Sequence, residues 1–573
     1  AVGLAEAYGL RHDRLNDLSD AYIRETQELE SVILYLLFGY DRATLTPDQQ
    51  ISFDVYDWYL DDRVRGHEFM YHNYPVTHML GSWDDELIRL LTELHPLDDQ
   101  QDAEDYIARL SQVDDQVEQL LDGLKRREEL GIIPPRFILE MALHNLGSIT
   151  SSSPQYTPFY TAFSEKLQAI ESLGEPEKQA LLEAAETEIT GSVIPGFGAL
   201  ADYITTLQAS ATDDEGVWKL PNGDAYYEWI LRQQASVDIT PDEVHELGLV
   251  EVERIQAEMR QVFDELRYPQ DANLGDLMSR AVDEGGYYDT QTTGGKEQVV
   301  EAYEALLDEV DRALDPVVDI RPEAEVIVMG GPMGGFYVPA PLDGSRPGVF
   351  HASTGGAWAP KYHMPTIAYH EAIPGHHFQI AIAQEMDLPL FRNDLFFNGY
   401  GEGWALYAEQ LAWELGLYDD DPYGNLGRLQ AELLRAVRLV VDTGIHAKQW
   451  TRAEAKAYMI EVLGEASGGM THEVERYIVL PAQATGYKVG MLKILELRQR
   501  AMDELGDAFD IKEFHNLVLG SGSMPLDILE RVVQDYIDAK LGRASTADMG
   551  SAKAIYEPVF EPDICHSTPV LAT

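Results

Sequence analysis

The chain has 573 residues, of which 45% are hydrophobic and 25% are charged, a composition typical of a folded globular protein. Its 99 Asp and Glu residues against 42 Lys and Arg residues give a formal net charge of -57. Such a chain repels the phosphates of nucleic acids and anionic lipids, so we expect neither of them as a partner.

The single cysteine, Cys565, restricts the chemistry of any metal site. An internal disulfide and a thiolate-rich metal site are both excluded, so a bound metal must use His, Asp and Glu side chains. No stretch reaches the roughly 18 uninterrupted apolar residues that cross a bilayer, so we predict no membrane span. Because the chain begins at Ala1 and not at Met, we expect an exported protein, periplasmic or extracellular, in preference to a cytoplasmic one.

Helical periodicity dominates the first 200 residues. Between Ala103 and Leu124, apolar residues recur at steps of three and four, which predicts an amphipathic helix. Clusters of turn residues predict breaks at 131–135, 151–158 and 191–198. This part of the chain is therefore expected to form packed helices.

The pattern changes in the middle of the chain. Thr240 and Pro241, followed by acidic residues, have the signature of a helix start, and the helix should run to about Leu266. Short apolar runs between Gly and Pro pairs predict strands within 325–354. Helical periodicity returns at Thr366 and continues to Gly542.

The segment TIAYHEAIPGHHFQI, residues 366–380, carries the most concentrated chemistry. His370 and Glu371 resemble the start of the zinc motif H-E-x-x-H, in which two histidines one helical turn apart bind zinc and the glutamate acts as general base. The next histidines here stand six and seven residues after His370, at His376 and His377. This spacing is longer than the motif allows on a regular helix.

A regular helix would place His377 about 10 Å along the axis from His370, too far for both to bind one ion. Pro374 lacks an N–H group and Gly375 is conformationally permissive, so together they predict a bulge in the helix. The bulge would bring one of the two later histidines back into range. Geometry alone leaves the choice between His376 and His377 open.

Resemblance to zinc peptidases suggests the complete ligand set. Those families place Gly directly before the second ligand, which favours His376 and makes His377 a supporting or pocket residue. The segment GYGEGWALYAEQ, residues 399–410, resembles the one that supplies the glutamate ligand of zinc aminopeptidases, which makes Glu402 the third ligand. Glu409, on the same helix face, is predicted to orient a ligating histidine. We expect one Zn²⁺ per chain, held by His370, His376 and Glu402.

Other residues are candidates for completing catalysis. Glu371 fits the general base, and Tyr487, which follows an irregular Pro-to-Gly segment, is the predicted donor to the oxyanion. Arg476, Tyr477 and Lys488 are further pocket candidates. Three more His-Glu pairs, at 67–68, 245–246 and 472–473, have no suitable partners and are expected to be unrelated to the metal, the last two on helix surfaces.

The segment FYVPAPLDGSRPGVFHAST, residues 336–354, precedes the metal segment. Its strands could pair with an extended peptide through an exposed edge. Within it, Arg346 could hold a carboxylate through two hydrogen bonds. His351, and His446 later in the chain, are candidate cleft residues. A small peptide is therefore the expected partner.

Four strings together resemble a bacterial family of metallopeptidase-like proteins that is catalogued as a domain of unknown function and grouped with the zincins. They are HEAIPGHHFQ, LDGSRPGVF, GEGWALYAEQL and the RY…PAQATGYKVG segment. The resemblance covers nearly the whole chain. It implies a mainly α, large two-lobed helical zincin-type (gluzincin) fold, similar to thermostable carboxypeptidase and angiotensin-converting enzyme, with a small β-sheet beside the active-site cleft. Many relatives are exported or lipid-anchored.

We therefore expect an N-terminal helical region over residues 1–225 and a catalytic metallopeptidase region over 226–573, or one integrated helical body. The expected function is zinc-dependent hydrolysis of peptide bonds in short peptides, in the manner of a carboxypeptidase or dipeptidase. A zinc hydrolase of a non-peptide amide, and a catalytically silent peptide-binding protein of the same fold, are the alternatives. The presence of Glu371, the predicted general base, argues against a catalytically silent protein. The sequence leaves the oligomeric state and the residue preference open.

Overall fold

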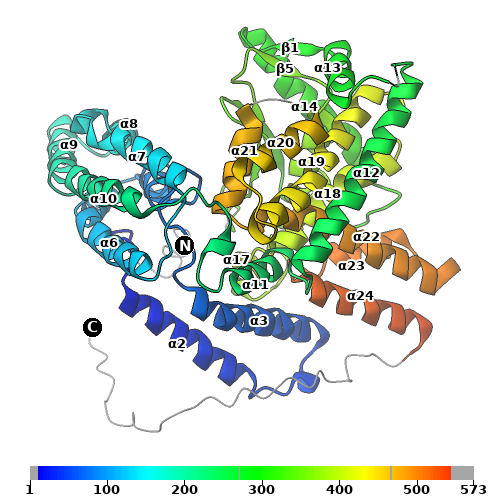
Figure 1. Ribbon diagram of the computed structural model, residues 1–573, viewed down its shortest axis with the longest axis horizontal. Coiled ribbons are helices and arrows are strands. Elements are labelled where there is room, and N and C mark those ends of the chain that lie inside the picture. The colour runs from blue at the N-terminus through cyan, green and yellow to red at the C-terminus, as the bar shows by residue number, and fades with distance from the viewer. Residues whose placement is uncertain (1–10, 270, 343, 465–467, 544–573) are drawn as a thin grey trace.

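The computed structural model describes residues 11–543 except 270, 343 and 465–467. Over these residues the chain is mainly α-helical, as the sequence predicts, and carries two small β-sheets where one was expected. Figure 1 shows a smaller group of helices set to one side of a larger body, with the first two helices along the base of that body.

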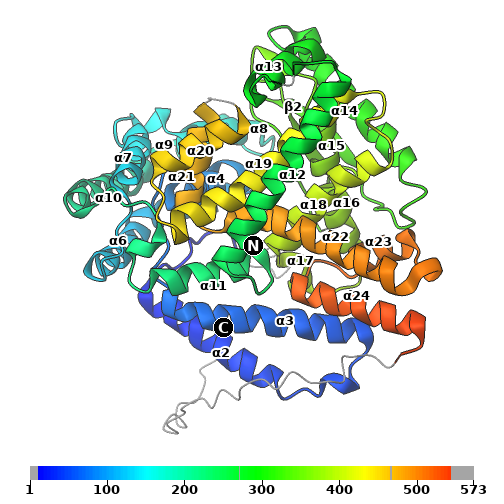
Figure 2. The ribbon, with the colours of Figure 1, turned by 45° about the vertical axis from the view of Figure 1, so that its right-hand side comes forward.

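The base consists of α2 (Asp20–Leu37) and α3 (Pro47–Gly66). Each begins at a side-chain cap, since Ser19 and Thr46 accept hydrogen bonds from the first turns of α2 and α3. Val55 of α3 is fully buried in the core of the larger body. The first described helices thus pack against the last third of the chain, where α3 contacts the last described helix (Figure 2).

The smaller group has its own apolar core. It comprises α4 (Trp83–Arg89), α5 (Gln100–Leu110), α6 (Val113–Glu129), α7 (Arg136–Thr150), α8 (Pro158–Ala169), α9 (Glu175–Glu188) and α10 (Ile194–Leu207). The breaks predicted at 131–135 and 151–158 separate α6 from α7 and α7 from α8. Each of these helices contributes buried side chains to one shared core.

Two predictions in this group were wrong. The helix expected over 103–124 is in fact two helices, since α5 ends at Ser111 and α6 begins two residues later. The apolar residues of both helices recur with the same period, so the sequence pattern does not show the break. The break expected at 191–198 is helical, since a π-helical turn over Ile189–Val193 leads directly into α10. Pro195 occupies the first turn of α10, where the missing N–H group is tolerated.

The larger body begins with α11 (Gly223–Ala235), α12 (Pro241–Glu265), α13 (Leu274–Gly285) and α14 (Thr293–Ala313). The helix predicted to start at Thr240 is α12. Thr240 caps it through a reciprocal pair of hydrogen bonds with Glu243, and Leu266 ends it. The start and end signals in the sequence were therefore correct.

In the sequence, the strands of the two sheets lie between α13 and the helix that begins at Met364. Their strands are β1 (Tyr287–Asp289), β2 (Val326–Gly331), β3 (Phe336–Val338), β4 (Gly348–Ser353) and β5 (Trp358–Pro360). β1 pairs with β5, and the larger sheet has the order β2-β4-β3, with β2 parallel and β3 antiparallel to β4. Strands were predicted within 325–354, and β2, β3 and β4 confirm them.

The remaining helices complete the body. They are α15 (Met364–Glu371), α16 (His376–Glu385), α17 (Leu390–Asp394), α18 (Asn398–Glu414), α19 (Pro422–Ala447), α20 (Arg452–Leu463), α21 (Gly468–Val479), α22 (Gly486–Leu505), α23 (Ile511–Leu519) and α24 (Leu526–Leu541). None of the helices within the described ranges is both long and apolar enough to cross a membrane.

The close packing of α18 on α22 positions part of the site. A Cβ atom at Gly403 of α18 would lie 2.5 Å from the main chain of Gly490 on α22, so this contact requires glycine. Glu402 and Tyr487 lie next to this contact, one on each helix. The glycine pair therefore brings the two functional candidates toward the same place.

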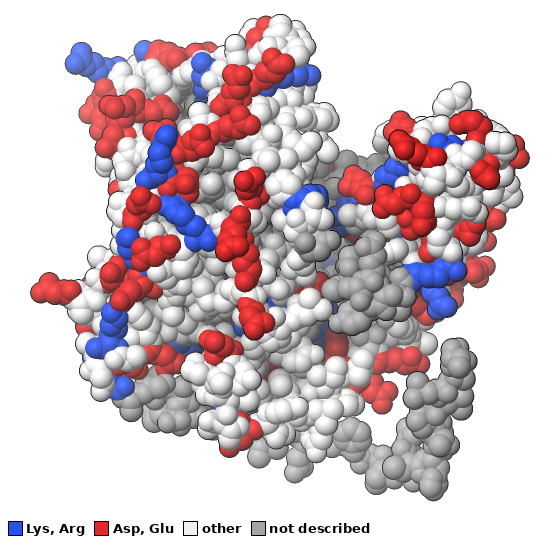
Figure 3. All heavy atoms as spheres, turned by 180° about the vertical axis from the view of Figure 1, so that it is seen from behind, with Lys and Arg blue, Asp and Glu red and all other residues white. Residues whose placement is uncertain are grey.

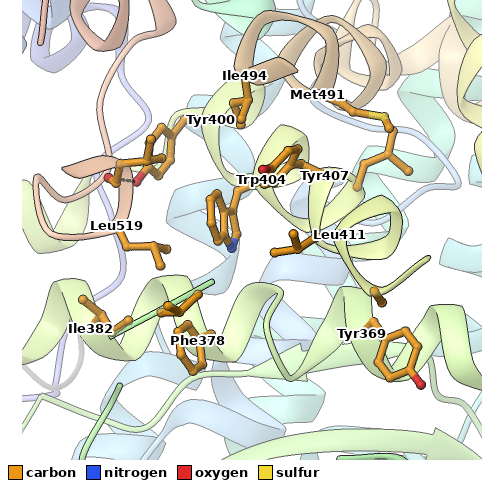
Figure 4. Close-up of a cluster of buried hydrophobic side chains, with 14 of the residues drawn as sticks. Tyr369, Phe378, Ile382, Tyr400, Trp404, Tyr407, Leu411, Met491, Ile494 and Leu519 are labelled. Carbon is orange, nitrogen blue, oxygen red and sulfur yellow. Dashed lines mark hydrogen bonds between the residues drawn. The ribbon is translucent and has the colours of Figure 1, made fainter. Parts of the chain in front are cut away.

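A buried cluster of mostly aromatic side chains packs between α18 and the neighbouring helices. Figure 4 shows Trp404 of α18 among Tyr400, Tyr407 and the side chains of Phe378 and Ile382 from α16. Trp404 is fully buried. Asp and Glu side chains are spread over both parts of the face seen in Figure 3, with fewer Lys and Arg among them.

Candidate metal centre

The break between α15 and α16 returns a histidine toward His370. Helix α15 ends at Glu371, the peptide bond between Ile373 and Pro374 is cis, and α16 begins at His376. A Cβ atom at Gly375 would lie 1.9 Å from the carbonyl oxygen of His370, so the chain can pass this close only with glycine. The expected bulge in one helix is thus a complete break between two helices.

His370, His376 and Glu402 converge, and their nearest ligand atoms all lie within 4.8 Å of one another. Oε2 of Glu402 is 3.5 Å from Nε2 of His370 and 3.3 Å from Nε2 of His376. Ligands at about 2.0–2.1 Å from a tetrahedral zinc ion are separated by about 3.3–3.4 Å. Among the described residues, this is the one group of three His, Cys, Asp or Glu side chains with such a geometry.

Two buried atoms of this group lack a hydrogen-bond partner, Oε2 of Glu402 and Nδ1 of His376. A buried carboxylate oxygen without a donor is costly unless a cation compensates it. The spacing and the uncompensated oxygen therefore both fit a divalent cation bound through two imidazoles and one carboxylate.

Charges in the group are tightly coupled. Burial lowers the pKa of His370, but the nearby carboxylates of Glu402 and Glu409 outweigh it and raise this pKa to about 9. Burial would raise the pKa of Glu402, yet His376 and His370 hold it well below its ordinary value. The carboxylates thus attract a positive charge to this position, which a proton supplies in the absence of metal and which a divalent cation can supply instead.

Glu409 supports the group from the side away from Glu402. Its Oε1 atom lies 2.8 Å from Nδ1 of His370, and its Oε2 atom accepts a hydrogen bond from the hydroxyl of Thr366. An N–H group at Nδ1 leaves the lone pair of Nε2 directed toward Glu402 and His376. The sequence suggested Glu409 for this position, and it missed Thr366.

His377 is turned away from the group. It is buried, and its Nδ1 atom lies 2.9 Å from the hydroxyl of Tyr337 on β3. Burial lowers the pKa of His377 to about 4, so the ring is neutral near pH 7. The structure brings His376, and not its neighbour, to His370 and Glu402.

Glu371 and Tyr487 lie beside the group. Burial raises the pKa of Glu371, against the attraction of His370 and His376. The ring of Tyr487 is nearly parallel to that of His370, with 6.4 Å between their centres. Burial also raises the pKa of Tyr487, so its hydroxyl remains protonated and can donate a hydrogen bond.

Arg476 and Tyr477 occupy different positions with respect to Tyr487. Arg476 lowers the pKa of Tyr487, and its guanidinium donates to the side chain of Gln483 at 2.5 Å. Tyr477 is fully buried, and its hydroxyl donates to Glu473 at 2.6 Å. The structure therefore brings Arg476 near the site and places Tyr477 in the core behind it.

Lys488 and His446, two further candidates from the sequence, are not brought to the cleft. Lys488 is fully buried, with its Nζ atom 2.6 Å from Glu432 and 2.9 Å from Glu251, so it serves an internal ion-pair cluster. His446 is also fully buried, and its Nε2 atom lies 2.9 Å from the carbonyl oxygen of Tyr477. Both residues are held by the core because each has buried partners on neighbouring helices.

The two candidates from the strand segment are more exposed. Arg346 is exposed, and its guanidinium donates to the carbonyl oxygen of Pro347 at 3.2 Å, which holds the turn before β4. His351 lies on β4 opposite Phe336 and stacks on it, with 4.6 Å between ring centres. Neither contact is with the metal group.

The other His-Glu pairs are separate from the metal group. His67 contacts Glu30 at 2.7 Å, whereas His72 contacts a main-chain carbonyl of another segment, so these two histidines do not converge. His245 was expected on a helix surface, and this was wrong. It is buried, with its Nδ1 atom 2.8 Å from the hydroxyl of Thr443.

Two arginines of α19 were missed by the sequence reasoning. The guanidinium of Arg438 lies 4.8 Å from the centre of the Tyr487 ring, and that of Arg435 lies 5.9 Å from it. Arg435 lines a pocket of about 370 Å³ together with His370 and Glu371. No sequence motif identifies these arginines as site residues. The sequence could have pointed to them only because two cationic residues one helical turn apart are unusual in a strongly acidic chain.

Comparisons with known proteins agree with the fold and leave the chemistry open. The model of a bacterial family of unknown function, DUF885, matches residues 3–533. A crystal structure of a "putative lipoprotein" from Colwellia psychrerythraea is 32% identical over 94% of this chain and 96% of the other, with a TM-score of 0.87. A "putative lipoprotein of unknown function" from Shewanella oneidensis is 18% identical over 91% and 94%, with a TM-score of 0.71. No curated protein matches the chain.

Proposed function

The chain belongs to the bacterial DUF885 family of unknown function, and we propose that it is a zinc-dependent peptidase that hydrolyses short peptides at His370, Glu371, His376 and Glu402. The observation that carries the proposal is the convergence of two imidazoles and one carboxylate, at zinc-like spacing, beside a buried glutamate. Three protein ligands leave one position free, as in catalytic zinc sites.

A zinc ion held by these residues would acidify a water molecule and polarise the scissile carbonyl. The carboxylate of Glu371 is suited to accept the proton of the attacking water and to pass it to the leaving amine, since burial makes it more basic than an exposed glutamate. The protonated hydroxyl of Tyr487 is suited to donate a hydrogen bond to the developing oxyanion. Glu409 would hold the imidazole of His370 in the required tautomer.

The proposal extends to the type of fold. Two histidines and a glutamate from a later helix are the ligand types of a gluzincin, and the two groups of helices in Figure 1 would correspond to the two lobes of such an enzyme. The three-stranded sheet favours a peptide as the substrate. Gly334 and Gly335 line the pocket directly before the edge strand β3, and an extended peptide could pair with that edge. Export of the protein is favoured by the names of the two structural relatives.

The test is a comparison of metal-stripped protein with protein reloaded with one equivalent of Zn²⁺. We expect a mixed library of short peptides to be cleaved by the reloaded protein and left intact by the stripped one. Cleavage of simple amides but of no peptide would favour a non-peptide amidase. Stoichiometric zinc binding with peptide retention and no cleavage would favour a binding protein.

A further inference from the structure

Arg435 is unusual among the arginines of its helix. Arg428 pairs with Glu432 at 3.3 Å and Arg438 with Glu473 at 2.9 Å. In contrast, Arg435 forms no ion pair with any carboxylate of the described residues, although acidic residues outnumber basic ones by 99 to 42 in this chain. Its Nη1 atom donates to the carbonyl oxygen of Ala431 in its own helix, and its buried Nε atom has no partner.

A half-buried guanidinium whose Nε atom is unpaired is costly, because the single hydrogen bond to Ala431 replaces only part of the water that burial removes. Such a group is stabilised when an anion binds to it, and a carboxylate fits its planar fork with two parallel hydrogen bonds. Arg435 is therefore poised for an anionic group that comes from outside the chain.

The position of Arg435 links this anion to the metal centre. The guanidinium lines the pocket that also contains His370 and Glu371, and it lies 5.9 Å from the ring centre of Tyr487. The Tyr487 ring in turn lies 6.4 Å from that of His370. An anion bound by Arg435 would thus lie in the pocket that His370 and Glu371 also line.

The other side chains that line the pocket restrict which kind of molecule can present the anionic group to Arg435. Ile367, Leu434, Leu463 and Met470 supply an apolar lining. The volume of about 370 Å³ is at the lower end for small-molecule sites, enough for one or two residues of a peptide. A cation without an ion pair, beside walls that are apolar in part, fits a short apolar segment that ends in a carboxylate.

We propose that Arg435 binds a carboxylate of the substrate and makes this chain selective for peptides that carry one next to the scissile bond. The proposal deepens the peptidase function above and rests on it. The carboxylate is either the C-terminus of the peptide or an acidic side chain, and both present the same group to the guanidinium. In this role Arg435 sets specificity, whereas Glu371 and Tyr487 act on the bond that breaks.

The first test uses three forms of one short apolar peptide with the zinc-loaded enzyme. One form has a free C-terminus, one has a C-terminal amide, and one has the amide with an acidic residue beside the scissile bond. We expect kcat/KM to fall about 10²-fold from the free acid to the amide, the effect of losing hydrogen bonds between charged groups. If the third peptide recovers the kcat/KM of the free acid, an acidic side chain of the substrate can supply the carboxylate that Arg435 binds.

The decisive variant is Arg435→Gln, with Arg312→Gln as control because Arg312 lies exposed on α14. We expect Arg435→Gln to lose about 10²-fold in kcat/KM on the free acid and little on the amide, so that the preference disappears. Equal losses on both peptides would overturn the proposal and assign Arg435 to the oxyanion instead. Unchanged preference would overturn it as well.

A binding measurement separates this proposal from the peptidase function. In a Glu371→Gln background, calorimetry compares the affinity of the free acid and the amide with and without Arg435→Gln. We expect the free acid to bind about 10²-fold more tightly only when Arg435 is present. Cleavage by the wild type without this difference in affinity would contradict the role of Arg435 and leave the peptidase intact. The affinity difference without any cleavage would leave the anion site intact and contradict the peptidase.

Discussion

Nδ1 of His370 lies 2.8 Å from Oε1 of Glu409, while Nε2 of the same ring lies 3.5 Å from Oε2 of Glu402. The two glutamates stand seven residues apart on α18, about two helical turns, and so face the same way. One helix therefore holds both sides of a single imidazole. The orientation of the ring is fixed by α18 and by the hydroxyl of Thr366, which donates to Glu409.

The support from Glu409 predicts a loss of metal affinity on substitution. Glu409→Gln keeps an oxygen near Nδ1 of His370 but removes the negative charge, and we expect zinc affinity to fall about 10–100-fold. Competition with a chelator measures the affinity. Gln410→Ala, one residue along the same helix, is the control, and an affinity of Glu409→Gln equal to that of the control would exclude the supporting role.

The choice between the two adjacent histidines can be tested by metal content. His376→Ala should lose zinc, because the remaining ligands are then only two. His377→Ala should retain it, because that ring contacts Tyr337 and not Glu402. Elemental analysis after dialysis decides between them, and retention in His376→Ala with loss in His377→Ala would reverse the assignment.

Tyr487→Phe removes one hydroxyl beside the candidate metal centre. If that hydroxyl donates to the oxyanion, kcat should fall about 10²–10³-fold, with KM and zinc content nearly unchanged. If Tyr487 only packs on His370, activity should persist, with at most about 0.5–1.5 kcal/mol lost from stability. Steady-state kinetics and thermal melting of this variant separate the two, and an unchanged kcat argues against the oxyanion role.

Asp442 gives the fold a pH dependence that is independent of the metal. Burial raises the pKa of its carboxyl from 3.8 to about 7, against the hydrogen bonds donated by Tyr227 and the main chain of Ala482. The folded state therefore holds a proton that the unfolded state releases above pH 3.8. This contribution to stability is full below pH 3.8 and is lost as the pH rises to about 7.

Asp442→Asn should remove that dependence. We expect the difference in melting temperature between wild type and variant to shift in favour of the variant as the pH rises from 5 to about 7.5. Melting curves across this range at constant salt provide the measurement. Parallel curves for the two proteins would mean that Asp442 is ionised in the fold throughout.

The parts of the structure that were predicted from the sequence depend on local signals. The capping pair of Thr240 and Glu243 marked the start of α12, and the Gly and Pro pairs marked the three strands of the larger sheet. The local pattern failed where the outcome depended on packing. Nothing near Ser111 distinguishes one long helix from two, because α5 and α6 bury stripes of the same period.

The same division applies to the candidate site. His370, Glu371 and Glu402 stood in recognisable segments, so their sequence neighbours identified them. Lys488 and His446 are equally polar in the sequence, yet their partners lie on helices far away in the chain, and only the fold reveals that they are buried. Arg435 was missed for the converse reason, because what marks it is an unpaired Nε atom and the lack of an ion pair within the described residues.

The most direct measurement of the central claim compares peptide cleavage by zinc-loaded wild type and Glu371→Gln. The amide is close in shape to the carboxylate but cannot accept a proton from the attacking water. Mass-spectrometric profiling of a peptide library should detect cleavage by the wild type and a loss of more than about 10²-fold in the variant, with one zinc ion bound in both. Cleavage within about tenfold of wild type, or no zinc in either protein, would contradict the account.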